Sequence, residues 1–159
     1  MLESIKDKAE IIITINANDI ENNKIRGDND ISYDTESIRL KQAFEQKGFL
    51  VNSIVITQFT HQDKAIRFEK YLDNLSIKHY RTYNINGYPN DIDHILSEEG
   101  FGKNDYVETT RPLVVVTGPG PGSGKMATCL SQMYLDHERG QRSSYAKFET
   151  FPIWNLGLM

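Results

Sequence analysis

The stretch LVVVTGPGPGSGKMATCL, residues 113–130, joins a predicted strand to a predicted helix through a loop of glycine and proline. Apolar and β-branched residues at 113–117 indicate a buried strand. The helix is expected over about residues 124–138, because Gly140 follows its last turn and ends it. A buried strand that leads into a glycine-rich loop and a helix is a building unit of parallel α/β sheets. This stretch therefore sets the expected fold class, and its loop raises the question of phosphate binding.

Strands and helices alternate along most of the chain. Apolar or alternating runs predict four further strands, at residues 10–16, 51–59, 78–85 and 144–151. Such alternation implies βαβ units with right-handed crossovers and helices on both faces of the sheet. We therefore expect a single α/β domain over residues 1–159. It would have three layers, α/β/α, around a mostly parallel, Rossmann-like sheet of about five strands.

The helices are predicted from apolar spacing and from their caps. One helix is expected at residues 35–47, with Asp34 or Thr35 as its N-cap. Another follows the sequence THQD at residues 60–63, which resembles a capping box. Its apolar stripe consists of Ala65, Phe68, Leu72 and Leu75. Residues 17–34 are rich in Asn, Asp and Gly and are expected to form a long loop.

The composition is that of an ordinary globular domain. Of the 159 residues, 38% are apolar and 25% are charged, and the formal net charge is −4. This acidic balance argues against a nucleic-acid partner, which would require a basic face. The single cysteine, Cys129, excludes an internal disulfide. No apolar run approaches membrane-spanning length and the first residues are too charged for a signal peptide, so we expect a cytoplasmic protein without a membrane partner.

The loop after residue 117 contains the groups that a phosphate cradle requires. Gly118, Gly120, Gly122 and Gly124 allow the backbone to fold closely around phosphate oxygens. Amide N–H groups at the start of the following helix would point at the anion, where the helix dipole adds partial positive charge. Lys125 could reach the β- and γ-phosphates of a nucleotide. A buried strand before such a loop and a helix after it are the context that a P-loop requires.

The match to the P-loop motif G-x-x-x-x-G-K-[ST] is imperfect. Pro119 occupies the position of the motif's first glycine, with a glycine on either side. The residue after the lysine is Met126, so the hydroxyl that usually binds Mg²⁺ is absent from that position. Ser123 and Thr128 are nearby hydroxyls outside the motif position. The sequence therefore favours phosphate binding over phosphoryl transfer or NTP hydrolysis, which need a clamping metal.

Two interpretations of the loop stay open. In the first, it binds a phosphorylated small molecule, with ATP or GTP and Mg²⁺ as the expected ligand. The residues expected to bind it are Gly118, Gly120, Gly122, Ser123, Gly124, Lys125 and Thr128. In the second, the loop is a structural Gly-Pro turn in a non-catalytic binding or assembly module. The apolar residues at 151–156 would then dock another part of a longer protein, or a second copy in a homo-oligomer.

Polar residues near the carboxyl ends of the predicted strands are further candidates for a substrate site. They are Asn16, Asp19, Arg26, Tyr88, Asp91, Lys103, Asn104 and Glu149. Asp19 or Arg26 could meet a ribose or a phosphate, although a solvated loop explains them equally. Asp91 and Asp93 are interpreted as caps of a short helix near residues 91–96 rather than as a base or a metal pair. Glu149 is the candidate for holding Mg²⁺ through water.

No catalytic residue and no set of metal ligands can be assigned from the sequence. The four histidines lack ligand spacing, and Cys129 is expected in the core rather than as a nucleophile. Arg111 lies at the amino end of the strand before the loop, so we expect a structural salt bridge rather than anion binding. If the loop is only a turn, the substrate site would lie around Tyr88, Asp91 and Lys103.

Three stretches of the sequence carry a resemblance to a known family. They are NANDIENNKIRGD, INGYPNDIDHILSEEGFGKNDYVETTRPLVVVTGPGPGSGKMATCLSQMY and YAKFETFPIWNL. With these stretches, the chain resembles over its whole length the bacterial family called domain of unknown function 1846, also uncharacterised protein family 0371. Members of that family are considerably longer, so the resemblance implies an amino-terminal fragment of a multidomain protein. The family has no established activity. Some members carry the label of an ATP-dependent peptidase, for which no protease motif is visible here.

Overall fold

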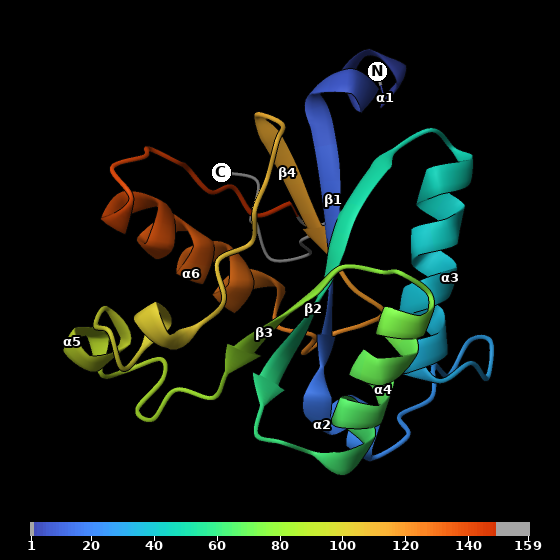
Figure 1. Ribbon diagram of the computed structural model, residues 1–159, viewed down its shortest axis with the longest axis horizontal. Coiled ribbons are helices and arrows are strands. Elements are labelled where there is room, and N and C mark those ends of the chain that lie inside the picture. The colour runs from blue at the N-terminus through green and yellow to red at the C-terminus, as the bar shows by residue number, and fades with distance from the viewer. Residues whose placement is uncertain (1, 149–159) are drawn as a thin grey trace, which may run out of the picture.

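The computed structural model describes residues 2–148 of the chain, and within them the centre is a parallel sheet of four strands in the order β3-β2-β1-β4 (Figure 1). The strands are β1 (Ala9–Asn16), β2 (Leu50–Phe59), β3 (His79–Tyr83) and β4 (Leu113–Thr117). The helices are α1 (Leu2–Ile5), η1 (Lys6–Lys8), α2 (Ala17–Glu21), α3 (Tyr33–Gln46), α4 (Asp63–Asn74), α5 (Ile92–Ile95), η2 (Phe101–Lys103) and α6 (Lys125–Glu138). None of these described helices is long and apolar enough to cross a membrane.

The central strand β1 is buried along its whole length. Its sequence is AEIIITIN, and β2 and β4 pair with its two edges in parallel. β-branched side chains suit a strand that packs on both faces. Glu10 at its start is also buried, and its carboxylate accepts hydrogen bonds from the backbone N–H (2.9 Å) and the hydroxyl (3.1 Å) of Thr110. The polar segment before β4 therefore satisfies the buried carboxylate and anchors the start of β1.

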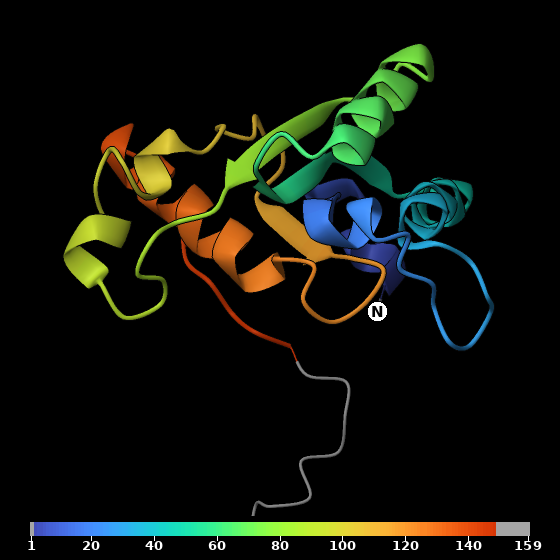
Figure 2. The ribbon, with the colours of Figure 1, turned by 90° about the horizontal axis from the view of Figure 1, so that it is seen from below.

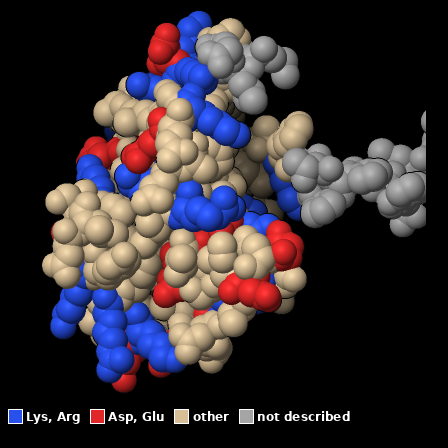
Figure 3. All heavy atoms as spheres, turned by 90° about the vertical axis from the view of Figure 1, so that its right-hand side faces the viewer, with Lys and Arg blue, Asp and Glu red and all other residues tan. Residues whose placement is uncertain are grey.

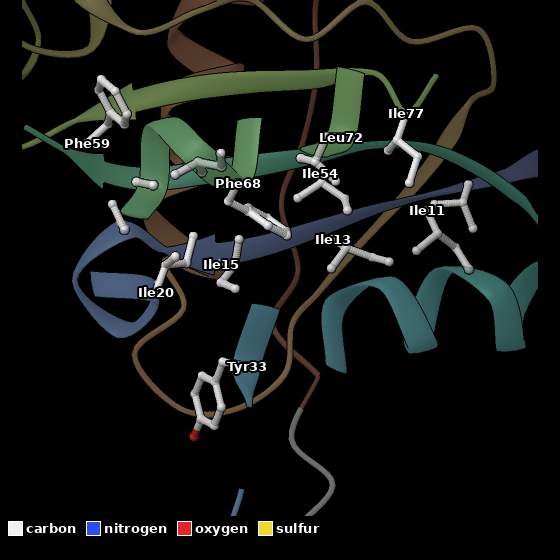
Figure 4. Close-up of a cluster of buried hydrophobic side chains, with 14 residues drawn as sticks. Ile11, Ile13, Ile15, Ile20, Tyr33, Ile54, Phe59, Phe68, Leu72 and Ile77 are labelled. Atoms are coloured by element: carbon white, nitrogen blue, oxygen red, sulfur yellow. The ribbon is translucent and has the colours of Figure 1, made fainter. Parts of the chain in front are cut away.

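Helices cover both faces of the sheet (Figures 1 and 2). On one face, Ile11, Ile13 and Ile15 of β1 pack with residues of β2, α2, α3 and α4 in the larger core (Figure 4). On the other face, which α6 covers, Ile12 and Val55 form a smaller core with Val107. The three layers expected from the sequence are therefore present.

Helix α4 shows how a predicted apolar stripe builds the larger core. Ala65, Phe68 and Leu72 are buried there, and a fully buried Phe or Leu side chain contributes roughly 1.5–3 kcal/mol. Leu75, predicted in the same stripe, is 45% exposed, because the helix has ended and this residue is its C-cap. Ile77, in the turn that follows, is buried instead.

The N-caps of α3 and α4 differ from those predicted. Helix α3 begins before residue 35, so neither Asp34 nor Thr35 is its N-cap, and Asp34 Oδ1 accepts a hydrogen bond from the N–H of Thr35 (2.8 Å). The capping box predicted at residues 60–63 does not form. Gln62 is the N-cap of α4, and its Oε1 accepts from the N–H of Thr60 (2.7 Å). Gln62 thus binds backbone before its helix, whereas Asp34 binds the N–H of the next residue within the first turn of α3.

Two further predictions are corrected by the structure. The long loop predicted at residues 17–34 begins with α2, because Asn16 caps it by accepting from the N–H of Asn18 (2.9 Å) and Ile20 enters the core. The strand predicted at residues 144–151 is not present in its described part, residues 144–148, and the remainder lies outside the described residues.

Arg111 binds backbone carbonyls instead of the predicted carboxylate. Its Nη1 donates to the carbonyl oxygens of Lys6 (2.6 Å) and Ala9 (2.8 Å). The residue lies at the amino end of β4, opposite the loop, as expected. Its contacts thus join the start of β4 to the start of β1. They hold Arg111 away from the loop, where an anion is expected to bind.

Candidate functional site

The strand order creates a switch point between β1 and β4. Strands β2 and β3 extend the sheet from one edge of β1, whereas β4 returns to pair with the other edge. The helices α3 and α6, which follow β1 and β4, lie on opposite faces (Figure 2). In open α/β sheets, ligands bind outside the carboxyl ends of the strands at such a point. Residues 118–124, which we call the Gly-Pro loop, begin at this position directly after β4.

The Gly-Pro loop folds over the carboxyl end of β1 and reaches β2. Thr14 Oγ1 on β1 lies 3.1 Å from Ser123 Oγ, and Asn16 Nδ2 donates to the carbonyl of Gly122 (3.1 Å). Thr57 Oγ1 on β2 donates to the carbonyl of Ser123 (2.8 Å). Ser123 itself is only 1% exposed. Polar side chains from two strands thus hold the loop against the sheet.

Close packing accounts for three glycines of the loop. A Cβ on Gly118 would lie 2.6 Å from the carbonyl oxygen of Thr14. A Cβ on Gly120 would lie 2.4 Å from the hydroxyl oxygen of Tyr33, whose ring is seated beside the loop (Figure 4). A Cβ on Gly124 would lie 2.7 Å from Thr57 Oγ1, and the φ of Gly124 is +88°, which L side chains rarely adopt. The fold therefore requires these three glycines whether or not a phosphate binds.

Side chains bind three carbonyl groups of the loop, whereas three of its amide N–H groups have no acceptor among the described residues. The carbonyls of Gly120, Gly122 and Ser123 accept hydrogen bonds from side chains. Among the hydrogen bonds of residues 2–148, the amide N–H groups of Gly120, Gly122 and Gly124 have no acceptor, whereas Ser123 closes the turn at residues 121–122. Gly124 is the N-cap of α6 and has no side chain, so no side-chain cap binds the first turn of the helix. The free donors lie where the helix dipole favours an anion.

Lys125, the first residue of α6, folds back over the loop. Its Nζ donates to the carbonyl of Gly120 (3.1 Å) and lies 3.4 Å from Ser123 Oγ. Both oxygens are neutral, so an anion that entered the loop would compete with them for the ammonium group. The lysine is thus placed at the loop, as its position in the motif predicts.

The described residues bring no set of metal ligands to the loop. Met126, which replaces the motif hydroxyl, is 46% exposed. Thr128 lies one turn into α6 and is buried, and its Oγ1 has no hydrogen-bond partner among the described residues. Those residues also contain no group of three His, Cys, Asp or Glu side chains that could hold a metal ion. Glu149, the predicted magnesium ligand, lies outside the described residues.

Asn16 is the candidate after β1 that the fold joins to the loop, through its bond to Gly122. Asp19 on α2 forms an ion pair with Lys24 (3.6 Å). The guanidinium of Arg26 binds the buried carboxylate of Glu36 (2.7 Å) and a neighbouring aspartate. Asp19 and Arg26 are therefore held by partners within residues 19–36.

The candidates near α5 are separated from the loop. Figures 1 and 2 both place α5 on the far side of α6 from the Gly-Pro loop. Asp91 Oδ1 accepts from the N–H of His94 (3.2 Å), so the predicted capping role is confirmed. Asn104 is buried and joins β3 to α6, because its side chain binds the backbone of β3 (2.8 Å) and Ser131 (2.9 Å). The other candidates in this region, Tyr88, Asp91 and Lys103, are exposed.

Cys129 lies half-buried on α6. Burial raises the pKa of its thiol, which lowers the fraction of reactive thiolate at neutral pH. This environment agrees with the prediction that the residue packs in the fold rather than acting as a nucleophile.

Sequence reasoning missed Thr14, Thr57 and Tyr33, which surround the loop. The two threonines carry a usable signal, because each is a polar residue near the carboxyl end of an otherwise apolar strand, in IIITIN and VITQF. Tyr33 carries none, since it meets Gly120 only after the chain has folded. The site is therefore larger than the motif that pointed to it.

A concave feature lies between α3 and α4, away from the Gly-Pro loop. It is a hollow of about 260 Å³ lined by Ile38, Phe68, Tyr71 and polar residues of α3. Figure 3 views this side of the molecule, on which acidic and basic side chains are intermixed. None of the residues predicted to form a site lines this hollow. The switch point therefore remains the candidate site.

Comparisons with known proteins place the chain among uncharacterised relatives. The sequence model of the family described as "Domain of unknown function DUF1846, N-terminal" matches residues 1–159. The chain is 57% identical over 158 residues to a UPF0371 protein of Streptococcus equi subsp. zooepidemicus (strain MGCS10565), and 58% identical to one of Streptococcus uberis. A UPF0371 protein of Streptococcus pyogenes serotype M5 is 56% identical. Each alignment covers 99% of this chain and 32% of the relative, so the chain spans about a third of the length of the curated relatives it matches.

Proposed function

The chain belongs to the DUF1846 family, whose description states no activity, and we propose a function from the geometry of the switch point. We propose that the Gly-Pro loop and Lys125 bind a phosphate group of a phosphorylated small molecule, with ATP and GTP as the first candidates. The observation that carries this proposal is the set of loop amide N–H groups without an acceptor among the described residues, at the start of α6. Such donors at a helix N-terminus favour phosphate oxygens.

Lys125 would supply the positive charge of the site. Its ammonium group binds two neutral oxygens of the loop, the carbonyl of Gly120 and the hydroxyl of Ser123. A phosphate oxygen carries negative charge and forms a stronger, charge-assisted hydrogen bond with a lysine. The ligand would therefore displace these two contacts by rotating the lysine side chain, without moving the backbone.

The arrangement supports binding more strongly than catalysis. The position that usually supplies the Mg²⁺ hydroxyl is Met126, and the buried hydroxyl of Thr128 is the nearest one on α6 without a partner in the described residues. Phosphoryl transfer requires metal clamping and in-line positioning of the nucleophile. We therefore propose that any NTP hydrolysis with Mg²⁺ would depend on groups outside the described residues.

One observation favours the alternative of a structural Gly-Pro turn in a non-catalytic module. Lys125 already has two oxygen partners in the loop, and packing against Tyr33 and Thr57 accounts for two glycines. A loop shaped only by such packing would need no ligand. The two functions differ in one measurable property, which is the affinity for phosphate.

Calorimetric titration of the full-length protein with ATP, GTP and pyrophosphate, with and without Mg²⁺, tests the proposal. We expect binding that weakens roughly 10- to 100-fold in Lys125→Ala, because a hydrogen bond to a charged group is lost. Lys70→Ala is the matched control, since Lys70 is an exposed lysine on α4, away from the loop. It should bind like the unmodified protein.

The pattern of ligands decides between the candidates. Equal affinities for pyrophosphate and the nucleotides would show that the phosphate alone is recognised, whereas a preference for ATP or GTP would show that the base is also bound. If none of the ligands binds to the folded protein, or if Lys125→Ala binds them equally well, the proposal is wrong and the loop is a structural turn.

A further inference from the structure

Strand β4 forms an open edge of the sheet. It pairs in parallel with β1 on one side, and no other described residue pairs with its outer side. Figure 2 shows it at the margin of the sheet opposite β3. Parallel sheets are normally covered on both faces. Proteins also usually protect an apolar edge strand against pairing with another strand.

One face of β4 is also uncovered. Leu113 and Val115 are 43% and 41% exposed, whereas their partners across the ladder, Ala9 and Ile11, are almost fully buried. Residues paired in this way share a face of the sheet, so both side chains point toward the layer of α3. Helix α3 packs on β1 and β2, and its cover ends before β4. The larger core therefore ends at β1, and Leu113 and Val115 lie beside it with exposed side chains.

The two edges of the sheet differ in the way expected of a closed and an open edge. The β3 edge carries Arg81, whose guanidinium binds Glu69 (2.6 Å), and His79, which binds Asp73 (2.7 Å). Charged side chains such as Arg81 and Glu69 protect an edge against further pairing. The β4 sequence, LVVVT, contains no charged residue and no proline. Only the β4 edge therefore suits the addition of another strand.

We propose that a strand from another part of the same, longer polypeptide pairs in parallel with the outer edge of β4, and that the segment joined to it covers Leu113 and Val115. The relatives are about three times as long as this chain, so polypeptide of the required length exists in them. Helix α6 already returns the chain to the amino end of the sheet, and a strand after such a crossover runs parallel to β4. Figure 2 shows residues 141–148 leaving α6 on the side of the sheet where β4 lies.

A second copy of the chain is the competing occupant. Pairing in cis is intramolecular, so its extent does not depend on protein concentration, whereas pairing with a second copy does. The same measurement can therefore separate the two occupants.

Cysteine labelling of the full-length protein tests the proposal. In a Cys129→Ala background, Val115→Cys reports the covered face, and Tyr71→Cys on α4, where Tyr71 is 51% exposed, is the matched exposed control. We expect a maleimide to label Val115→Cys at least about tenfold more slowly than Tyr71→Cys in the folded protein, and equally fast after denaturation. The protection should be unchanged on dilution.

Two outcomes would overturn the proposal. Equal labelling rates in the folded protein would show that β4 remains open, and protection that disappears on dilution would assign the face to a second copy.

Hydrogen exchange on the unmodified full-length protein tests the same pairing without a cysteine substitution that could cause misfolding. There, protection of every amide in residues 113–117 is the expected result, because a strand with two neighbours bonds on both sides. Protection of alternate amides alone would contradict it.

Discussion

At the residue scale, the Gly-Pro loop depends on small side chains that meet backbone from distant strands. Thr57 donates to the carbonyl of Ser123, and its side chain also fills the space where a Cβ of residue 124 would lie. Asn16 caps α2 with its oxygen and binds the loop with its nitrogen. Each of these residues serves the fold and the loop at once, so substitutions at the site will change stability as well as affinity.

Replacement of Gly124 by alanine is expected to destabilise the protein more than replacement of Gly122. Both glycines have a positive φ, +88° and +74°, so both alanine variants adopt a left-handed backbone, which costs about 1 kcal/mol. Only at Gly124 would the Cβ also collide with Thr57, at 2.7 Å, whereas nothing lies within 4 Å at Gly122. We expect the free energy of unfolding to fall by about 1 kcal/mol for Gly122→Ala and by about 3 kcal/mol for Gly124→Ala.

Urea denaturation of the two alanine variants measures this difference directly. If both variants lose the same stability, the loop has moved away from Thr57 and the close approach does not constrain residue 124.

At the scale of one element, Glu36 attaches α3 to the segment before it. The side chain is buried, and it accepts two hydrogen bonds from Arg39 (2.6 and 2.7 Å) and one from Arg26 (2.7 Å). The hydrogen bonds and charge of Arg39, followed by those of Arg26, hold the pKa of Glu36 below its ordinary value of 4.5. These ion pairs fix the start of α3, where Tyr33 packs against the Gly-Pro loop.

Stability at acid pH is expected to depend on Glu36. Because its pKa is lower in the folded than in the unfolded chain, its stabilising effect is present above about pH 4.5 and is lost as the pH falls through the folded value. Glu36→Gln should lower the free energy of unfolding at pH 7 by about 2 kcal/mol, through the loss of charge-assisted hydrogen bonds. It should also show a weaker decline between pH 5 and pH 3.

Denaturation at a series of pH values checks both effects. Glu45→Gln is the control, since Glu45 forms an exposed pair with Lys41 and should change stability by less than about 0.5 kcal/mol. An identical acid decline in Glu36→Gln and the unmodified protein would contradict the assignment.

At the scale of the whole molecule, the two outer layers are held unequally. The α3 and α4 layer packs on the larger core, whereas the smaller core within residues 2–148, on the face that α6 covers, includes no side chain of α6. Among the polar contacts of α6, Gln132 Nε2 donates to the carbonyl of Val107 (2.8 Å) and the hydroxyl of Tyr106 donates to Asp136 (2.7 Å). A layer with fewer buried apolar contacts opens first, so we infer that α6 is the less stable side of the domain.

Alkaline pH is expected to weaken the α6 layer through Tyr106. Burial and the hydrogen bond to Asp136 raise its pKa to about 12. Because this value exceeds the ordinary value of 10.0, the stabilising effect is complete below pH 10 and is lost as the pH rises through about 12. Tyr106→Phe should lower the free energy of unfolding by about 1 kcal/mol at pH 8, and this deficit should shrink by pH 11.

Urea denaturation at pH 8 and pH 11 tests this expectation, with Tyr71→Phe, an exposed tyrosine on α4, as the control. If the loss of stability in Tyr106→Phe is the same at both pH values, ionisation of Tyr106 does not change the stability of the folded protein.

Local patterns in the sequence predicted most of the elements but not their ends. The apolar run of β1 and the strand, loop and helix at residues 113–130 were predicted correctly. The errors occur mainly at the ends of elements, where contacts with distant residues decide where a helix begins or ends. Asn16 starts α2 inside a predicted loop, and Leu75 is exposed because the chain turns before it can join the stripe of α4. Tertiary packing decides such choices, since local propensities differ by less than the free energy of burying one side chain.

The sequence by itself determined the α/β class, the glycine loop before α6 and the lysine at its end, because strand and helix periodicity and glycine placement are encoded within a few neighbouring residues. The tertiary structure alone decided the strand order β3-β2-β1-β4, the open edge of β4 and the contacts of the loop with Tyr33 and Thr57. These features depend on which edges and side chains meet across long stretches of chain. Such pairings follow from the burial of the whole core, and no local pattern records them.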